Sequence, residues 1–275
     1  MKPLLKWAGG KRHIAPLLEN HLPADWNKGK YFEPFIGGAA FFLYLNPNSA
    51  NISDINQWLI GFYNDVKSRP TELLNLIRTY ADIFDSLESI EQKDYYLSLR
   101  KSFNETDVSL ESSALFYSLN KLCFNGLYRE NSSGKFNVPF GQKKKFPTLI
   151  ESNFSDVSLR LQNCNIELSD FEATVSKATA GDFVYFDPPY VPLPDSPSFT
   201  SYSSEGFGKE AQMRLAKCMF ELQEKGVKAM LSNSLTPLTS EIFSGLRQLT
   251  IQAPRMVSAK SSGRGDIDEL LVMNY

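Results

Sequence analysis

Cysteine and histidine are scarce in this sequence, with three of the first and two of the second in 275 residues. Cys123, Cys164 and Cys218 lie far apart without a paired spacing, so we expect neither a zinc ribbon nor a disulfide framework. His13 and His21 both lie near the start, which gives little basis for a Ser-His-Asp hydrolase or a histidine-rich metal centre. We therefore expect reduced thiols, a cytoplasmic protein, no metal ion and two surface-exposed histidines.

Long apolar runs are lacking as well. The first eleven residues include three lysines and no apolar signal-peptide core, and no later window reaches the roughly 18 apolar residues of a membrane span. A chain that is 42% apolar and 22% charged is typical of a folded globular protein. We expect one large domain or two modest ones, without export or a membrane partner.

The net charge of −2 conceals two regions of opposite sign. Residues 71–111 contain nine acidic and four basic side chains, whereas residues 120–147 contain six basic and one acidic. A local basic excess on an acidic protein is typical of a surface that binds a polyanion. A solvated lysine-rich loop would give the same pattern.

Strand and helix patterns alternate at both ends of the chain. Between Thr71 and Phe124 apolar residues recur at helical spacing, and residues 131–134 (Asn-Ser-Ser-Gly) are typical of a hairpin turn. The order predicts an α/β fold with a doubly wound, mainly parallel sheet, an edge hairpin, and an inserted helical segment. We expect helices at 39–45, 57–67 and 209–225, and strands at 31–35, 51–54, 165–168, 183–186, 228–232, 247–252 and 269–273.

The most specific motif is Asp187-Pro188-Pro189-Tyr190, directly after the apolar strand 183–186. Each proline locks φ and removes an N–H, so the backbone course is fixed and the carbonyls there cannot pair onward in the sheet. An acid, carbonyl groups and an aromatic ring are thus presented where α/β folds bind ligands. An ordinary turn that ends a strand could contain the same prolines.

These groups suit methylation of an exocyclic amine on a nucleobase. Such an amine is a poor nucleophile, because its lone pair is delocalised into the ring. If Asp187 and the Pro188 carbonyl accept its two N–H hydrogens, the lone pair is directed at an incoming methyl group. Tyr190 would stack on the base, which has to be flipped out of a duplex.

A second motif, residues 33–38 (Glu-Pro-Phe-Ile-Gly-Gly), follows the first strand and opens a helix. Its glycines allow a cofactor to approach the backbone closely. Asp54 ends the next strand 17 positions after Gly37, near the spacing at which an acid meets ribose hydroxyls. The G-x-G-x-x-G pattern is incomplete, and residues 8–11 (Ala-Gly-Gly-Lys) depart from a P-loop on both sides, which argues against a nucleoside triphosphatase.

Six motifs in order resemble the Dam family of DNA adenine-N6 methyltransferases, alpha group, over residues 5–271. The resemblance implies a Rossmann-like methyltransferase sheet with an inserted helical DNA-recognition domain and hairpin. Residues 1–56 and 148–275 would form the S-adenosylmethionine-binding catalytic domain, and residues 57–147 the target-recognition domain. The motifs are residues 5–11 (Leu-Lys-Trp-Ala-Gly-Gly-Lys), 33–38, 53–56 (Ser-Asp-Ile-Asn), 124–127 (Phe-Asn-Gly-Leu), 136–141 (Phe-Asn-Val-Pro-Phe-Gly) and 187–190.

The resemblance also implies the reaction, which is methyl transfer from S-adenosylmethionine to a flipped adenine in double-stranded DNA, within GATC. S-adenosylhomocysteine would be the product. It implies catalytic roles for Asp187, Pro188 and Tyr190. The residues it places against the donor are Trp7, Lys11, Phe35, Gly37, Asp54, Asp170, Phe171 and Asp187.

For DNA, the family motifs imply contacts from Lys6, Phe124, Asn125, Leu127, Arg129 and Pro139. Arg129 can grip guanine with two hydrogen bonds, and Leu127 and Pro139 can offer apolar contact to base edges. A surface salt bridge and loop packing are the structural alternatives for these residues. Lys143, Lys144, Lys260 and Arg264, in basic or glycine- and serine-containing segments, are candidate phosphate contacts.

Two departures from the family pattern bear on the target sequence. Phe124 keeps the aromatic ring that relatives commonly have at this position, but it has no hydroxyl. Gln142-Lys143 stand where Arg-Tyr is frequent. We expect residues 191–208 to form a lid over the flipped adenine or the DNA backbone, and a simple flexible linker is the alternative.

Other functions stay open at this point. A catalytically silent DNA-binding protein could keep the same architecture, although it would not need Asp187 or the donor residues. Methylation of another amine is a further alternative, but protein-glutamine enzymes typically carry Asn, and cytosine-N4 enzymes Ser, at the position of Asp187. We expect a monomer, and three roles stay open: an enzyme that stands alone, one that protects a host from a companion nuclease, or one that belongs to a phage.

Overall fold

The computed structural model describes residues 1–147, 149, 151–191, 207–254 and 266–275. Within these, the chain divides into two compact units. The proposed lid lies mostly outside the described residues. The first unit comprises Met1–Gly10, Gly37–Leu43 and Asp54–Leu168, and the second comprises Lys11–Ile36, Tyr44–Ser53 and Ser169–Tyr275.

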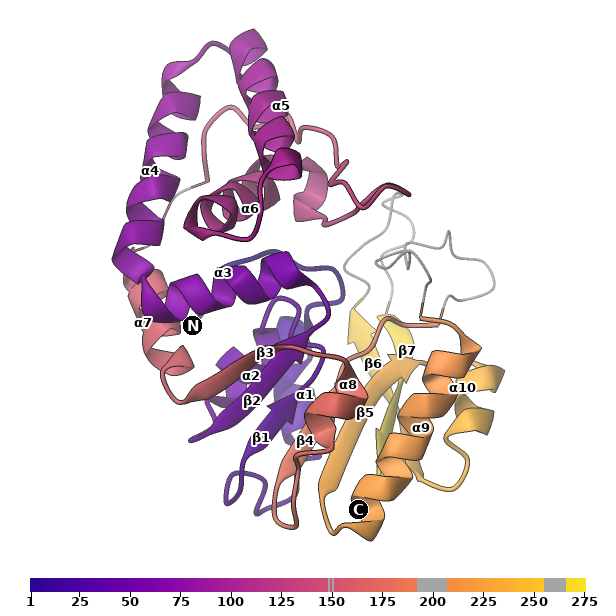
Figure 1. The fold of residues 1–275 in the computed structure, drawn as a ribbon. Coiled ribbons are helices and arrows are strands. Elements are labelled where there is room, and N and C mark those ends of the chain that lie inside the picture. Colours follow the sequence, from indigo (N-terminus) through magenta and orange to yellow (C-terminus); the bar gives the residue numbers. More distant parts are fainter. Residues whose placement is uncertain (148, 150, 192–206, 255–265) are drawn as a thin grey trace. The chain divides into compact units, whose positions relative to one another are not determined.

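The first unit is mainly helical. Its central helix, α6, packs against α3, α4 and α5, and most of its residues are buried, as expected of a helix surrounded by others (Figure 1). Proline at N1 begins α4, and capping boxes begin α5 and α6. The elements are α3 (Gln57–Ser68), α4 (Pro70–Ser86), α5 (Ser89–Glu105), α6 (Leu110–Leu122), the 3-10 turn η2 (Phe124–Gly126), α7 (Glu151–Leu161) and β3 (Cys164–Leu168).

The predicted hairpin turn is confirmed. The side chain of Asn131 accepts hydrogen bonds from the N–H groups of Ser133 and Lys135, both at 3.0 Å. Gly134 adopts the left-handed conformation with φ of 70°, and Glu130 bridges to Phe136 across the turn. The hairpin therefore closes through an Asx-type turn.

The second unit carries most of the sheet. Strands β1 (Tyr31–Glu33), β2 (Ala50–Asp54), β4 (Phe183–Phe186) and β5 (Lys228–Ser234) pair in parallel, whereas β7 (Asp266–Met273) runs antiparallel to both β5 and β6 (Arg247–Pro254). These six strands of a mixed seven-stranded sheet follow the order β2-β1-β4-β5-β7-β6. The expected α/β fold, with its helical segment and antiparallel edge pair, is confirmed.

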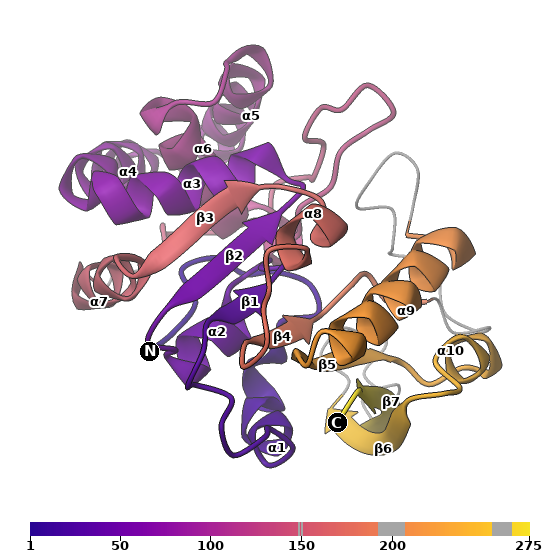
Figure 2. The same cartoon turned by 60° about the horizontal axis from the view of Figure 1, so that its bottom comes forward.

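Helices of the second unit cover the sheet beside β4 and β5. α9 packs on β5 and contacts both α8 and α10 (Figure 2). Leu215, Met219 and Leu222 of α9 are buried against the apolar side chains of these strands. The helical elements are η1 (Lys11–His13), α1 (Ala15–Glu19), α2 (Ala40–Leu45, partly in the first unit), α8 (Phe171–Val175), α9 (Lys209–Glu224) and α10 (Pro237–Ile242).

Several expectations need correction. The strand expected at 247–252 continues to Pro254, and the one expected at 269–273 begins at Asp266. The first strand ends at Glu33 rather than at Phe35, because Pro34 has no N–H to continue the ladder. The strand expected at 228–232 continues to Ser234, where the chain still pairs with β7. His21 is half-buried rather than exposed, and its carbonyl accepts the hydroxyl of Tyr275 at 2.8 Å.

All three cysteines are free and buried. Among the helices that the structure describes, none has the length and apolar character to span a bilayer. In the same part of the chain, no three His, Cys, Asp or Glu side chains are grouped so that they could hold a metal ion.

Candidate active site

Asp187 follows the last residue of β4, a strand whose four residues are all buried. The amino group of Lys11, which is 5% exposed, lies 3.1 Å from Oδ1 of Asp187 and 3.8 Å from Oε2 of Glu269. Burial raises the pKa of Asp187 to about 6; Lys11 opposes this rise and the carboxylate of Glu269 adds to it. One buried ammonium group is thus shared by two acids.

Tyr190 completes this cluster. Its hydroxyl donates to Oε2 of Glu269 at 2.8 Å, and Nζ of Lys11 lies 4.2 Å from the centre of its ring. Burial, with Asp187 and Glu269 nearby, raises the pKa of the Tyr190 hydroxyl well above its usual value. The structure therefore brings Lys11, Asp187 and Tyr190 together, and it adds Glu269, which we did not predict from the sequence.

The turn that follows Asp187 is held by two buried side-chain amides, those of Gln212 and Asn233. Nε2 of Gln212 donates to the carbonyl of Pro189 at 3.4 Å, and the N–H of Val191 donates to Oδ1 of Asn233 at the same distance. Asn233 in turn donates to Oε1 of Gln212 at 2.8 Å, and both side chains are fully buried. This pair of side chains supplies hydrogen-bond partners to the Pro189 carbonyl and the Val191 N–H, which lie past the end of β4 and have none from the sheet.

A third group surrounds Asp170 and Phe171 at the start of α8. Asp170 caps the helix through its side chain and forms an ion pair with Arg214 at 3.1 Å. The rings of Phe171 and Phe35 are stacked with centres 5.5 Å apart, and the Arg214 guanidinium lies 4.9 Å from the centre of the Phe171 ring. The predicted donor residues Phe35, Asp170 and Phe171 therefore form one cluster.

The remaining predicted donor residues meet in the first unit. Gly37 has φ of +44°, and a Cβ atom there would lie 2.7 Å from the indole ring of Trp7. Its N–H donates to Oδ2 of Asp54 at 3.2 Å, while Oδ1 accepts the N–H of Asn56 at 3.0 Å. Burial raises the pKa of Asp54 to about 6 against these hydrogen bonds. The half-exposed indole of Trp7 stacks on Tyr128 with ring centres 5.6 Å apart.

Asn120, at the end of α6, joins the N-terminal segment to the turn at η2. Its side chain accepts the N–H of Lys6 at 2.9 Å and donates to the Lys6 carbonyl at 2.8 Å and to the Gly126 carbonyl at 3.2 Å. The side chain of Lys6 lies over Gly126, where a Cβ atom would come within 2.7 Å of it. Exposed Lys6 is thus held beside exposed Phe124 and Asn125.

The other predicted DNA contacts lie along the hairpin and after it. Arg129 is exposed, and its Nε donates to Oδ1 of Asn137 at 2.7 Å. Pro139 is exposed and accepts the N–H of Phe124 at 2.9 Å, while Leu127 is half-buried. Lys143 and Lys144 are exposed, whereas Lys260 and Arg264 lie outside the described residues.

The sequence analysis missed Glu269, Gln212, Asn233 and Asn120. A signal for two of them exists, because Asn233 and Glu269 are polar residues inside otherwise apolar strand patterns. Such residues need hydrogen-bonding partners, which here are Tyr190 and Lys11 for Glu269, and Gln212 and the Val191 N–H for Asn233.

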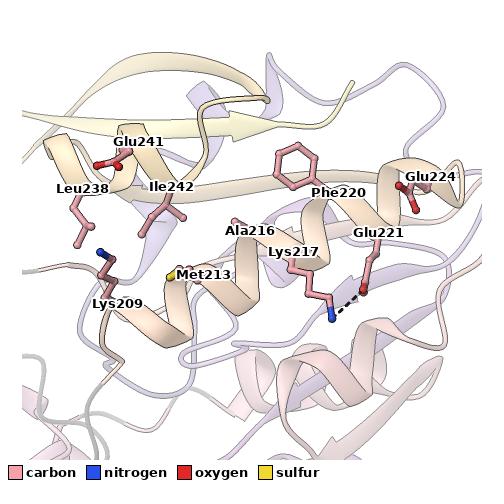
Figure 3. Close-up of a pocket in the computed structure, with 10 residues that line it drawn as sticks. All are labelled: Lys209, Met213, Ala216, Lys217, Phe220, Glu221, Glu224, Leu238, Glu241 and Ile242. Carbon is pink, nitrogen blue, oxygen red and sulfur yellow. Dashed lines mark ion pairs between the residues drawn. The ribbon is translucent and has the colours of Figure 1, made fainter.

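A hollow in the second unit shares no residue with these clusters. It lies between α9 and α10, and its lining combines apolar side chains such as Phe220 with charged ones such as Lys209 and Glu241 (Figure 3). We assign no part of the proposed chemistry to it.

Comparison with known proteins extends over the whole chain. The family model for D12 class N6 adenine-specific DNA methyltransferases matches residues 7–257. The type II methyltransferase M1.LlaDCHI of Lactococcus lactis subsp. cremoris is 41% identical over 281 residues, which cover 100% of this chain and 96% of the relative. M.MjaIII, a type II methyltransferase of Methanocaldococcus jannaschii, is 40% identical over 287 residues (100% and 99%). The DNA adenine methylase of Escherichia coli K12 is 33% identical over 273 residues (99% and 95%).

Proposed function

Because this chain belongs to the D12 class of N6 adenine-specific DNA methyltransferases, the Dam family, we propose that it transfers a methyl group from S-adenosylmethionine to a flipped adenine within GATC in duplex DNA. Its class of activity is EC 2.1.1.72. The observation that carries the proposed mechanism is the half-buried carboxylate of Asp187, placed at the end of β4 by a turn that two prolines and the buried side-chain amides of Gln212 and Asn233 hold.

The residues of this chain suit the donor. In the first unit, Gly37 and Trp7 approach so closely that a side chain at position 37 would collide with the indole. Each oxygen of Asp54 takes one backbone N–H and keeps acceptor capacity for a ribose hydroxyl. In the second unit, Asp170 offers a hydrogen-bond acceptor to an adenine ring. The Phe35–Phe171 stack offers it an apolar surface. Bound S-adenosylmethionine supplies an electrophilic methyl group.

Asp187 and the Pro188 carbonyl accept the two N–H hydrogens of the target amine. The Pro189 carbonyl already accepts the Gln212 amide, so Pro188 is the carbonyl that we assign to the substrate. As the N6–carbon bond forms, the electron pair of the broken sulfur–carbon bond stays on sulfur, and N6 then passes one proton to the Asp187 carboxylate, which is partly exposed and returns it to solvent. A charged Asp187 stabilises the positive charge that develops on N6.

Tyr190 offers its ring to the flipped base, and its hydroxyl is held by Glu269. Base–aromatic stacking is worth about 1–3 kcal/mol in proteins that bind single strands. This contact offsets part of the few kcal/mol needed to unstack and unpair the adenine.

We assign target recognition to residues 57–147. The exposed side chains of Lys6 and Arg129 can donate to guanine acceptors, and the exposed lysines after the hairpin can meet phosphates. Support for GATC comes from the match of Lys6, Leu127, Arg129 and Pro139 to the family's reading positions.

The test is methylation-sensitive sequencing of DNA from cells that express this chain. We expect N6-methyladenine in GATC. Methylation of adenine in another motif would refute GATC as the target sequence but would support adenine methylation. Methylation of cytosine alone would refute adenine methylation.

A further inference from the structure

Glu269 is an acid in the interior of the sheet. It lies on β7, opposite Ser234 of β5 and Ile251 of β6, and it is 8% exposed. A buried carboxylate is destabilising unless it is paired and hydrogen-bonded. A structural acid would find such partners on its own strands, so the partners of Glu269 are informative.

Both partners belong to the cluster proposed for catalysis. Oε2 of Glu269 accepts the Tyr190 hydroxyl at 2.8 Å and lies 3.8 Å from Nζ of Lys11. The Lys11 ammonium lies closer to Asp187, at 3.1 Å, and also contacts the Tyr190 ring. Glu269 therefore contacts both the stacking ring and the cation beside the catalytic acid.

We propose that Glu269 is a positioning residue of the methyl transfer, which orients the Tyr190 ring through its hydroxyl and draws Lys11 away from exclusive pairing with Asp187. This inference rests on the proposed function and adds a residue to it. Glu269 acts through its neighbours and need not touch the substrate.

The first consequence concerns the ring. A hydrogen bond from the tyrosine hydroxyl fixes the position of its oxygen and so limits rotation about the Cα–Cβ bond. The ammonium on one ring face adds a cation–π attraction, worth about 0.5–2 kcal/mol depending on desolvation. Loss of the hydrogen bond alone, as in Tyr190→Phe, should loosen the ring without removing the stacking surface.

The second consequence concerns charge. The groups that face Asp187 are Lys11 from the N-terminal segment, Glu269 from β7 and Tyr190 from the same turn, with Tyr185 of β4 and Tyr31 of β1 further back. Glu33 on β1 lies beside Tyr31. Since the Glu269 charge raises the pKa of Asp187, its removal should let Asp187 stay ionised at lower pH.

The variants separate the two effects. Glu269→Gln keeps an oxygen that can accept the Tyr190 hydroxyl and removes the charge, whereas Tyr190→Phe keeps the charge and removes the hydrogen bond. Glu241→Gln removes an acid from α10, in the hollow away from the cluster, and serves as the charge control. The measurements are kcat as a function of pH, with saturating S-adenosylmethionine and duplex DNA, and the Kd for DNA.

We expect Glu269→Gln to move the acid limb of the kcat profile to lower pH by roughly half a unit or more, with Glu241→Gln unchanged. We expect Tyr190→Phe to lower kcat about 3- to 10-fold with the Kd for DNA unchanged. A Glu269→Gln profile that coincides with that of the wild type, or Tyr190→Phe with wild-type kcat, would overturn the proposal. Either result leaves adenine methylation by the wild type intact, so the test is separate from that of the proposed function.

Discussion

Nζ of Lys11 lies 3.1 Å from Oδ1 of Asp187, and the lysine is the more deeply buried of the two. The two residues are far apart in the sequence and belong to motifs that look unrelated when read alone. Lys11 follows a glycine-rich segment that imitates a phosphate-binding loop, yet in the structure its ammonium faces a carboxylate. The ion pair thus brings residues of both motifs together at the end of β4.

Replacement of Asp187 should abolish turnover and leave DNA binding intact. Asp187→Ala removes the acceptor for the target amine and the stabilisation of positive charge on N6, so we expect kcat to fall at least about 100-fold. The measurements are labelled methyl transfer and the Kd for duplex DNA by fluorescence anisotropy. Asp82→Ala, an exposed acid on α4, is the matched control. Wild-type turnover in Asp187→Ala would refute the catalytic role.

Activity should decline on the acid side of about pH 6. The pKa of Asp187 is raised to about 6, so the carboxylate is charged above this value and protonated below it. A protonated Asp187 has lost its charge, and kcat should therefore fall about tenfold per pH unit below the limb. The measurement is kcat from pH 5 to 8.5, at saturating donor to keep the titration of Asp54 out of the profile. A flat kcat between pH 5 and 7 contradicts this assignment.

Much of the fold follows from local patterns. β4 is a run of four apolar residues that two prolines soon follow, so its end can be located in the sequence. Helices α8 and α10 were not predicted, because each is about one or two turns long and depends on its cap and its packing. The contacts of Glu269 and Gln212 could not be foreseen, since these residues reach Lys11 and the turn after Asp187 from elements that only the tertiary fold brings together.

Donor binding should be sensitive to the space beside Trp7. Gly37→Ala places a methyl group 2.7 Å from the indole at a left-handed φ, so the ring has to move. We expect the Kd for S-adenosylmethionine to rise at least about tenfold, measured by calorimetry. Gly181→Ala also places an alanine at a positive φ (+93°), with nothing within 4 Å of the new methyl group, and should bind the donor like the wild type. Equal effects of the two variants would mean that strain, and not Trp7, is responsible.

Arg129 should determine sequence choice, and Lys143 should not. Arg129→Ala should reduce discrimination by about 1–3 kcal/mol at one base pair of the target. Lys143→Ala should weaken binding equally on all sequences and lower the slope of log K against log salt by about one. Competition binding with single-base variants of the target, at several salt concentrations, measures both. Uniform weakening by Arg129→Ala would make Arg129 a phosphate contact.

The buried amides behind the turn should matter for kcat more than for binding. Gln212→Leu removes the donor to the Pro189 carbonyl and the acceptor of the Asn233 amide, while it keeps a similar volume. We expect kcat to fall about 5- to 20-fold, since a turn displaced by a fraction of an ångström misplaces its acceptors, with KM for DNA and donor changed less than about 3-fold. Thermal unfolding checks that the variant is folded. A change in KM alone would assign Gln212 to substrate binding.

The most direct test of the account uses S-adenosylmethionine labelled in its methyl group and duplex DNA, followed by digestion to nucleosides and separation. The account predicts label in N6-methyl-2′-deoxyadenosine alone for the wild type, and none for Asp187→Ala despite unchanged DNA binding. Label in a cytosine nucleoside, or no incorporation by a wild-type protein that binds both DNA and donor, would contradict it.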